Sequence, residues 1–166
     1  MSVYASNKKI IIDLSNISHF SEICDIMKEH AIENYVYEFN FNGTVIKYGM
    51  STALSRHYGD RIYRQAGHLE GWPLGPLIGP SGSEMYFINQ DYYKLTGQNL
   101  NRNGMKIIVT DLSNQSKLEC EKLEKYLIET HITIHGKAPI GNKDNKTKFY
   151  VRKHNNTKRF NELFNF

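Results

Sequence analysis

Two runs of aromatic and β-branched residues, separated by Asn42-Gly43, constrain the fold of this chain more than any other feature. The runs cover residues 34–41 and 44–50, and residues of these types favour strands. Asn-Gly between two such runs is the strongest short-range signal for a turn that joins antiparallel strands. The sequence therefore predicts a β-hairpin in the first third of the chain.

Short strands and helices are predicted on both sides of this hairpin. Hydrophobic periodicity indicates strands over residues 8–14 and 105–112, and helices over residues 17–31, 51–68, 83–95 and 116–131. The second helix should break or bend at Gly59, and residues 71–82, rich in proline and glycine, should form a loop. Ser116 and Glu119 form a capping box at the start of the last helix. We expect an α/β (α+β) fold, in which helices flank a small central antiparallel sheet of about three strands, the hairpin included.

The length and composition are those of one globular domain. We expect a single domain over residues 1–166, with a supporting strand and helix in 1–33 and a basic C-terminal arm in 136–166. No apolar run approaches the ~20 residues of a membrane span, and the first residues lack the apolar segment of a secretory signal. We therefore expect an intracellular, cytoplasmic protein in which Cys24 and Cys120 are reduced and do not form a disulfide.

Positive charge is concentrated near the C-terminus. Residues 136–161 contain six lysines and two arginines against one acid, Asp144, whereas the net charge of the whole chain is only +4. A basic, asparagine-rich segment of this kind is either a solvated tail or an arm that binds phosphate groups. The composition leaves both interpretations open.

The hairpin also carries a motif. Tyr35-Val36-Tyr37 is followed, ten residues on, by Lys47-Tyr48-Gly49, and these two tripeptides resemble the signature of the GIY-YIG nuclease family. Tyr35 replaces the first glycine of that signature. Lys47 replaces its second tyrosine, as in some small restriction enzymes of the family. The resemblance implies a metal-dependent DNA endonuclease, closest in appearance to the small type II restriction endonucleases.

The register of the hairpin decides whether Tyr37 and Lys47 can act together, because directly opposed residues share a face of the sheet. A two-residue turn would place Tyr37 opposite Tyr48 and send Lys47 to the other face. A three-residue turn that ends at Gly43, with a bulge, would place Tyr37 directly opposite Lys47. We expect the second register. An ammonium group beside the phenol would favour the phenolate, which can take a proton from water.

Three arginines are candidates for a cation that neutralises the phosphate. Residues 59–65 are similar to the arginine helix of the family, and Arg61 is the first choice within them. Arg64 lies one helical turn further on and precedes His68 in an R-x-x-x-H pattern that the family also has. Arg56 is nearer to the usual distance from Gly49. The sequence does not decide among the three.

Glu124 is the most informative residue of the last predicted helix. On a helical wheel it falls inside the apolar arc formed by Cys120, Leu123, Leu127 and Ile128. A carboxylate at such a position needs a partner, either a metal ion or an arginine in a buried salt bridge. In the family, a glutamate at this place binds the metal ion.

The resemblance also implies a mechanism and partners. Glu124 would hold one Mg²⁺ or Mn²⁺ ion, Tyr37 would activate water, and Lys47 and Arg61 would neutralise developing charge. Asn142 matches a family asparagine and would hold Glu124 or the phosphate. The substrate would be double-stranded DNA, cut by a homodimer at a specific site. DNA contacts are expected from the basic residues that follow Asn142, namely Lys143, Lys146, Lys148, Arg152 and Lys153.

Two other interpretations of the sequence remain. A nucleic-acid-binding protein without catalytic activity could have the same fold, and an unrelated small α/β enzyme could match the hairpin motif by chance. The sequence contains no G-x-x-x-x-G-K-[ST], H-E-x-x-H or G-x-S-x-G motif and no paired-cysteine zinc site. This absence weakens the second of these interpretations.

Overall fold

The sheet determines how the rest of this protein is arranged. Residues 7–52, 58–69, 80–100, 104–142 and 161–162 are described by a computed structural model. Its four antiparallel strands follow the order β1-β4-β2-β3. They are β1 (Lys9–Asp13), β2 (Tyr35–Phe41), β3 (Thr44–Ser51) and β4 (Met105–Asp111). The expected α+β fold with a central antiparallel sheet is confirmed. The sheet has four strands where about three were expected, because β1 pairs with β4 and joins the same sheet.

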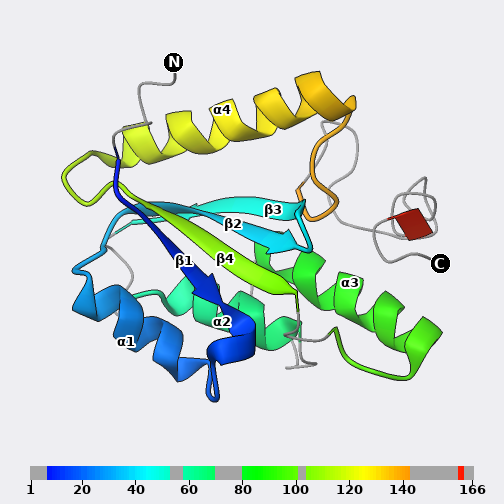
Figure 1. The fold of residues 1–166 in the computed structure, drawn as a ribbon. Coiled ribbons are helices and arrows are strands. Elements are labelled where there is room, and N and C mark those ends of the chain that lie inside the picture. The colour runs from blue at the N-terminus through cyan, green and yellow to red at the C-terminus, as the bar shows by residue number, and fades with distance from the viewer. Residues whose placement is uncertain (1–6, 53–57, 70–79, 101–103, 143–160, 163–166) are drawn as a thin grey trace.

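Helices cover both faces of the sheet (Figure 1). They are α1 (Ser21–Glu29), α2 (Asp60–His68), α3 (Pro80–Thr96) and α4 (Lys117–His135), and a short 3-10 turn, η1 (Leu14–Asn16), follows β1. α4 lies across one face, over β2 and β3, and the other three helices lie on the opposite face. Strand β3 lies at the edge of the sheet. α4 is on one side of it, and α2 and α3 are on the opposite face of the sheet.

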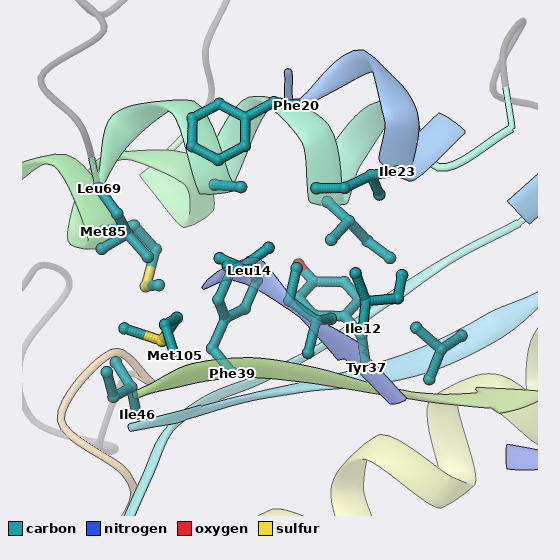
Figure 2. Close-up of a cluster of buried hydrophobic side chains, with 14 of the residues drawn as sticks. Ile12, Leu14, Phe20, Ile23, Tyr37, Phe39, Ile46, Leu69, Met85 and Met105 are labelled. Atoms are coloured by element: carbon teal, nitrogen blue, oxygen red, sulfur yellow. The ribbon is translucent and has the colours of Figure 1, made fainter. Parts of the chain in front are cut away.

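The main core fills the layer between the sheet and the three helices of its second face. Ile12, Tyr37, Phe39 and Ile46 from the sheet side meet Ile23 and other apolar residues of the helices there (Figure 2). A smaller cluster lies under α4 on the first face, where Val36, Leu112, Cys120 and Leu123 are buried together. Tyr37 and Val36, neighbours in β2, therefore point into different cores, as alternation along a strand requires.

The boundaries of the helices differ from those expected in several places. The first helix was expected to begin at residue 17, but α1 begins at Ser21. The 3-10 turn η1 and the extended Ile17 come before it. Ser51 belongs to β3 rather than to a helix, and α2 begins only after Gly59, whose φ of 69° is left-handed. In α4 the predicted cap is confirmed, since Ser116 accepts a hydrogen bond from the Glu119 amide at 3.3 Å.

The hairpin has neither of the two registers considered above. Asn42 and Gly43 have φ values of 49° and 89°, so the turn has two residues, and Asn40 pairs with Val45. A β-bulge then inserts Ile46, which shifts the register so that Phe39 pairs with Lys47 and Tyr37 pairs with Gly49. The expected three-residue turn was wrong, and so was the expectation that Tyr37 stands opposite Lys47. Both residues nevertheless lie on one face of the sheet, because the bulge reverses the effect of the two-residue turn.

Membrane spans and disulfides were both expected to be absent. None of the helices that the structure describes combines the length and the apolar composition needed to span a lipid bilayer. Cys24 and Cys120 are free thiols, as predicted, and the Cys120 side chain of α4 is buried.

Candidate active site

Tyr37 lies inside the main core, with only 1% of its surface exposed. Burial raises the pKa of its hydroxyl group well above the ordinary value, although Arg61 and a hydrogen bond from Gln65 act in the opposite direction. Tyr37 is therefore a neutral phenol in the free protein, not the phenolate that a pairing with Lys47 implied. Arg61, rather than Lys47, is the cation whose charge favours ionisation of this phenol most strongly.

Two residues fix the ring of Tyr37. A Cβ atom on Gly49 would overlap the end of the phenol ring, so the ring lies directly over Gly49 and needs a residue without a side chain there. The Gln65 side-chain amide in α2 donates a hydrogen bond of 2.7 Å to the Tyr37 hydroxyl group, and Gln65 is itself buried. The phenol oxygen is thus held between edge strand β3 and helix α2.

Lys47 is buried as well, and its partner comes from α3. Its Nζ atom lies 3.7 Å from Oε2 of Glu84, and the two side chains are 5% and 2% exposed. Burial lowers the pKa of Lys47, whereas Glu84 and then Glu124 raise it. Glu84 was not among the candidates predicted from the sequence. It lies one helical turn before Ile88, another buried residue of the same helix face, so a search for acids within apolar faces would have found it.

Arg61 is the arginine that the structure connects to the other candidates. It lies in the first turn of α2, is exposed, and donates from Nη1 to the Met50 carbonyl group of β3 at 3.2 Å. Its charge acts on Tyr37, Lys47 and Glu124. Arg64 is also exposed on α2, but its charge is not one of those that shift the pKa of these three residues. Arg56 lies outside the described residues.

His68 ends α2 on the buried side of that helix. The side chain is buried, and its ring meets the ring of Tyr86 edge to face, with centroids 6.2 Å apart. A histidine packed in this way serves the contact between α2 and α3. The R-x-x-x-H pattern made His68 a further, less certain candidate for the site, and the structure places it in the packing between α2 and α3.

Glu124 occupies the position that the helical wheel predicted. Cys120 and Leu123 of α4 are buried, Leu127 is half-buried, and Glu124 is half-buried beside them. Burial raises the pKa of Glu124, while Lys47 and Arg61 lower it. Glu119, Glu121 and Glu129 instead form ion pairs with neighbouring lysines on the outer side of the helix.

The donor set fits a metal ion that is shared with a substrate rather than one enclosed by protein. In the described part of the chain, no three His, Cys, Asp or Glu side chains are grouped so that they could hold a metal. Mg²⁺ commonly binds one or two carboxylates and takes its remaining ligands from water and substrate phosphates. Glu124 is half-buried, and the positive charges of Lys47 and Arg61 lower its pKa, so it is a suitable single carboxylate.

Asn142 has a different position from the one expected. Its side-chain amide accepts from the Tyr48 amide at 2.8 Å and donates to the Tyr48 carbonyl group at 2.9 Å. The Gly141 amide bonds to the Ile46 carbonyl group at 2.7 Å. These bonds satisfy backbone groups at the outer edge of β3, which no neighbouring strand pairs because β3 is an edge strand. Asn142 therefore holds the hairpin that carries the candidate site, and its amide is directed at backbone rather than at Glu124.

Four of the five principal candidates influence one another electrostatically around β3, although α4, which carries Glu124, covers the face of the sheet opposite to the side chains of Tyr37 and Lys47. Tyr37, Lys47, Arg61 and Glu124 come from β2, β3, α2 and α4, yet each lies within electrostatic range of at least two of the others. Asn142 is bonded to the backbone of Tyr48, the residue after Lys47 in β3. The basic residues Lys143, Lys146, Lys148, Arg152 and Lys153 lie outside the described part of the chain, so the structure does not test the proposed DNA-binding arm.

Comparison of the chain with known protein families, with curated proteins and with solved structures found no match.

Proposed function

We propose that this protein is a metal-dependent endonuclease that hydrolyses phosphodiester bonds of DNA, as its likeness to the GIY-YIG signature implies. The observation that carries the proposal is the convergence of Tyr37, Lys47, Arg61 and Glu124 beside edge strand β3. A phenol, two cations and a half-buried carboxylate together match the needs of phosphodiester hydrolysis, namely a group to orient water and charges to stabilise a phosphate.

Arg61 is the residue that first meets the substrate. It is exposed, and its guanidinium group is held against β3 by the Met50 carbonyl group. A guanidinium group can bind two phosphate oxygens at once. A phosphate bound there would lie next to Tyr37, on which Arg61 already acts.

Tyr37 orients the attacking water. The water oxygen would form a bond to phosphorus while the bond from phosphorus to the leaving oxygen breaks. The ionised form of Tyr37 would accept the water proton, and a solvent water would protonate the leaving oxygen. Gln65 donates to the phenol oxygen, and both this bond and Arg61 favour its ionised form. Lys47 supplies a second fixed positive charge on the same face of the sheet.

Glu124 would hold the divalent ion, Mg²⁺ or Mn²⁺. When bound, this ion would act as a Lewis acid on the phosphate and would add positive charge near Tyr37. Burial raises the pKa of Glu124 above its ordinary value, and Lys47 and Arg61 offset this rise only in part. A bound cation would further favour the ionised carboxylate.

The biological role is proposed to be that of a restriction-type enzyme. One site of this kind cuts one strand, so double-strand cleavage at a short site calls for a homodimer and a palindromic target. Lys143, Lys146, Lys148, Arg152 and Lys153 would bind the DNA backbone.

A cleavage assay tests this proposal. Supercoiled plasmid DNA is incubated with the protein and Mg²⁺, with and without chelator, and with Glu124→Gln and Glu121→Gln variants. Glu121 is an exposed residue of the same helix, paired with Lys117, so it controls for loss of one charge. We expect cleavage by the wild type and by Glu121→Gln, none by Glu124→Gln, and DNA binding by all three in Ca²⁺. Full activity of Glu124→Gln would exclude Glu124 as the metal ligand.

Burial of Tyr37 and Lys47 favours a second candidate, a DNA-binding protein that keeps this arrangement without catalysis. In that case the buried phenol and the Lys47–Glu84 pair would serve only the packing of the core. DNA binding without metal-dependent cleavage by the wild type would select this second function.

A further inference from the structure

The pair formed by Lys47 and Glu84 links the hairpin to α3. The Nζ–Oε2 distance is 3.7 Å, and both side chains are almost fully buried. Removing a charge from water is costly, and an isolated buried ammonium group tends to lose its proton. Lys47 can therefore remain charged at this position only if an acid balances it.

Within the described part of the chain, three charged groups face Lys47 from the elements packed against it. They are Glu84 from α3, Glu124 from α4 and Arg61 from α2. Arg61 opposes the ammonium form, and both glutamates favour it, Glu84 the more strongly. Tyr37, on the same face of the sheet, is neutral in the free protein.

These two glutamates are not equivalent under the proposed function. Glu124 is the carboxylate that a divalent ion would neutralise, and a bound metal and Arg61 would both disfavour a further positive charge beside them. Glu84 is paired with Lys47 in the core and is not part of that metal site. It is therefore the acid that can still balance Lys47 when the site is loaded.

We propose that Glu84 is a positioning residue, whose carboxylate keeps Lys47 protonated and fixes its Nζ atom at the site. This inference rests on the proposed function in one respect, since only a catalytic Lys47 makes the effect visible in cleavage. The ion pair itself can be tested in the free protein.

The first test measures the pKa of Lys47 directly. NMR spectra of the lysine side chains of ¹³C,¹⁵N-labelled protein are recorded against pH, without DNA or metal, and Lys47→Arg identifies the signal. We expect Glu84→Gln to lower the pKa of Lys47 by about one unit or more. Glu129→Gln, which removes an exposed charge from α4, should leave it unchanged. An unchanged Lys47 pKa in Glu84→Gln would overturn the proposal.

A second variant covers the possibility that Glu84→Gln does not fold. Glu84→Asp keeps the charge but shortens the side chain by one methylene group, so it lengthens the ion pair. We expect the Lys47 pKa to fall in Glu84→Asp, but by less than in Glu84→Gln. A Lys47 pKa in Glu84→Asp equal to that of the wild type would by itself count against the proposal.

The cleavage arm separates a positioning role from a purely structural one. As the pH rises, single-turnover cleavage by Glu84→Gln should begin to decline at a lower pH than cleavage by the wild type. On the alkaline side, activity should be about tenfold lower if the Lys47 pKa falls by one. A structural role would reduce the rate equally at every pH. If the wild type does not cleave DNA at all, the proposed function fails, while the NMR titration still decides whether Glu84 holds the charge of Lys47.

Discussion

Gly49 lies directly beneath the phenol ring of Tyr37, its partner in the neighbouring strand. The closeness of the two explains why a glycine follows Tyr48 in the motif, because any Cβ atom at this position would overlap the ring. It also directs the Tyr37 hydroxyl group across β3, toward the edge of the sheet where Arg61 is bonded to Met50.

Replacement of Gly49 by alanine should therefore displace Tyr37. We expect Gly49→Ala to reduce the free energy of unfolding by about 1–3 kcal/mol, the usual cost of an overpacked core. In a Tyr37→Leu background, which removes the ring, the same replacement should cost less, by at least ~0.5 kcal/mol. Urea denaturation of the four proteins of this cycle measures both values. Additive effects would mean that the two residues do not touch.

The hydroxyl group of Tyr37 should have separate effects on stability and on rate. Tyr37→Phe leaves the buried Gln65 amide without its acceptor, which should cost about 1–3 kcal/mol. It should also lower the cleavage rate by ~10²-fold or more, the range of a lost general base. A second change, Gln65→Leu, should restore stability but not the rate.

Tyr48→Phe is the matched control for this variant. This replacement also removes a phenol hydroxyl group, but Tyr48 lies on the other face of the sheet from Tyr37. Burial and then Glu38 raise the pKa of Tyr48 to about 12. We expect its cleavage rate to stay near that of the wild type. An equal loss of rate in both variants would remove Tyr37 from the mechanism.

Local sequence patterns predicted the strands, the place of the hairpin turn and the position of Glu124 among apolar residues, and tertiary contacts explain the rest. Asn42-Gly43 marks the turn, although the turn has two residues rather than the expected three. The bulge at Ile46 has no such signal, because it depends on packing in the main core and on the bond from the Gly141 amide. The register of Tyr37 therefore depended on residues almost a hundred positions away.

The same distinction applies to the site. Glu124 was found because a carboxylate among apolar residues of one helix is visible in the sequence. Glu84 has the same property in α3, where Met85 and Ile88 are buried beside it. Gln65 lies one turn after Arg61 in α2, yet an amide carries no pattern of its own. Its contact with Tyr37 requires the packing of α2 on the sheet.

Glu124 should reduce the stability of the free protein at neutral pH. Burial raises its pKa above the unfolded value, so the stabilising effect is complete at low pH, where the group is neutral. The effect is lost as the pH rises through the folded pKa. We therefore expect Glu124→Gln to unfold at a higher temperature than the wild type at pH 7, and at the same temperature below about pH 4. Thermal unfolding without metal measures this, and a destabilised variant at pH 7 would contradict the pKa direction.

The basic arm should account for much of the salt dependence of DNA binding. Replacing its five proposed DNA-binding residues by glutamine should lower the slope of log K against log salt by about 0.9 for each phosphate group that the arm no longer neutralises. A control protein carries the same number of glutamines at exposed lysines elsewhere, namely Lys9, Lys28, Lys94, Lys106 and Lys125. Equal slopes in the two proteins would identify the arm as a solvated tail.

Arg61 and Arg64 provide a matched pair, because both are exposed residues of α2 separated by less than one turn. Arg61 acts on Tyr37, Lys47 and Glu124, and its guanidinium group is fixed by the Met50 carbonyl group. We expect Arg61→Ala to lower the single-turnover cleavage rate by ~10²–10³-fold, as for the loss of a group that stabilises developing charge. Arg64→Ala should lower it by less than about tenfold, the effect of weaker binding to one phosphate group. Arg61→Lys should recover only part of the rate, since an ammonium group keeps the charge but cannot bind two phosphate oxygens at once. A larger loss in Arg64→Ala than in Arg61→Ala would reverse the assignment and place the substrate phosphate at Arg64.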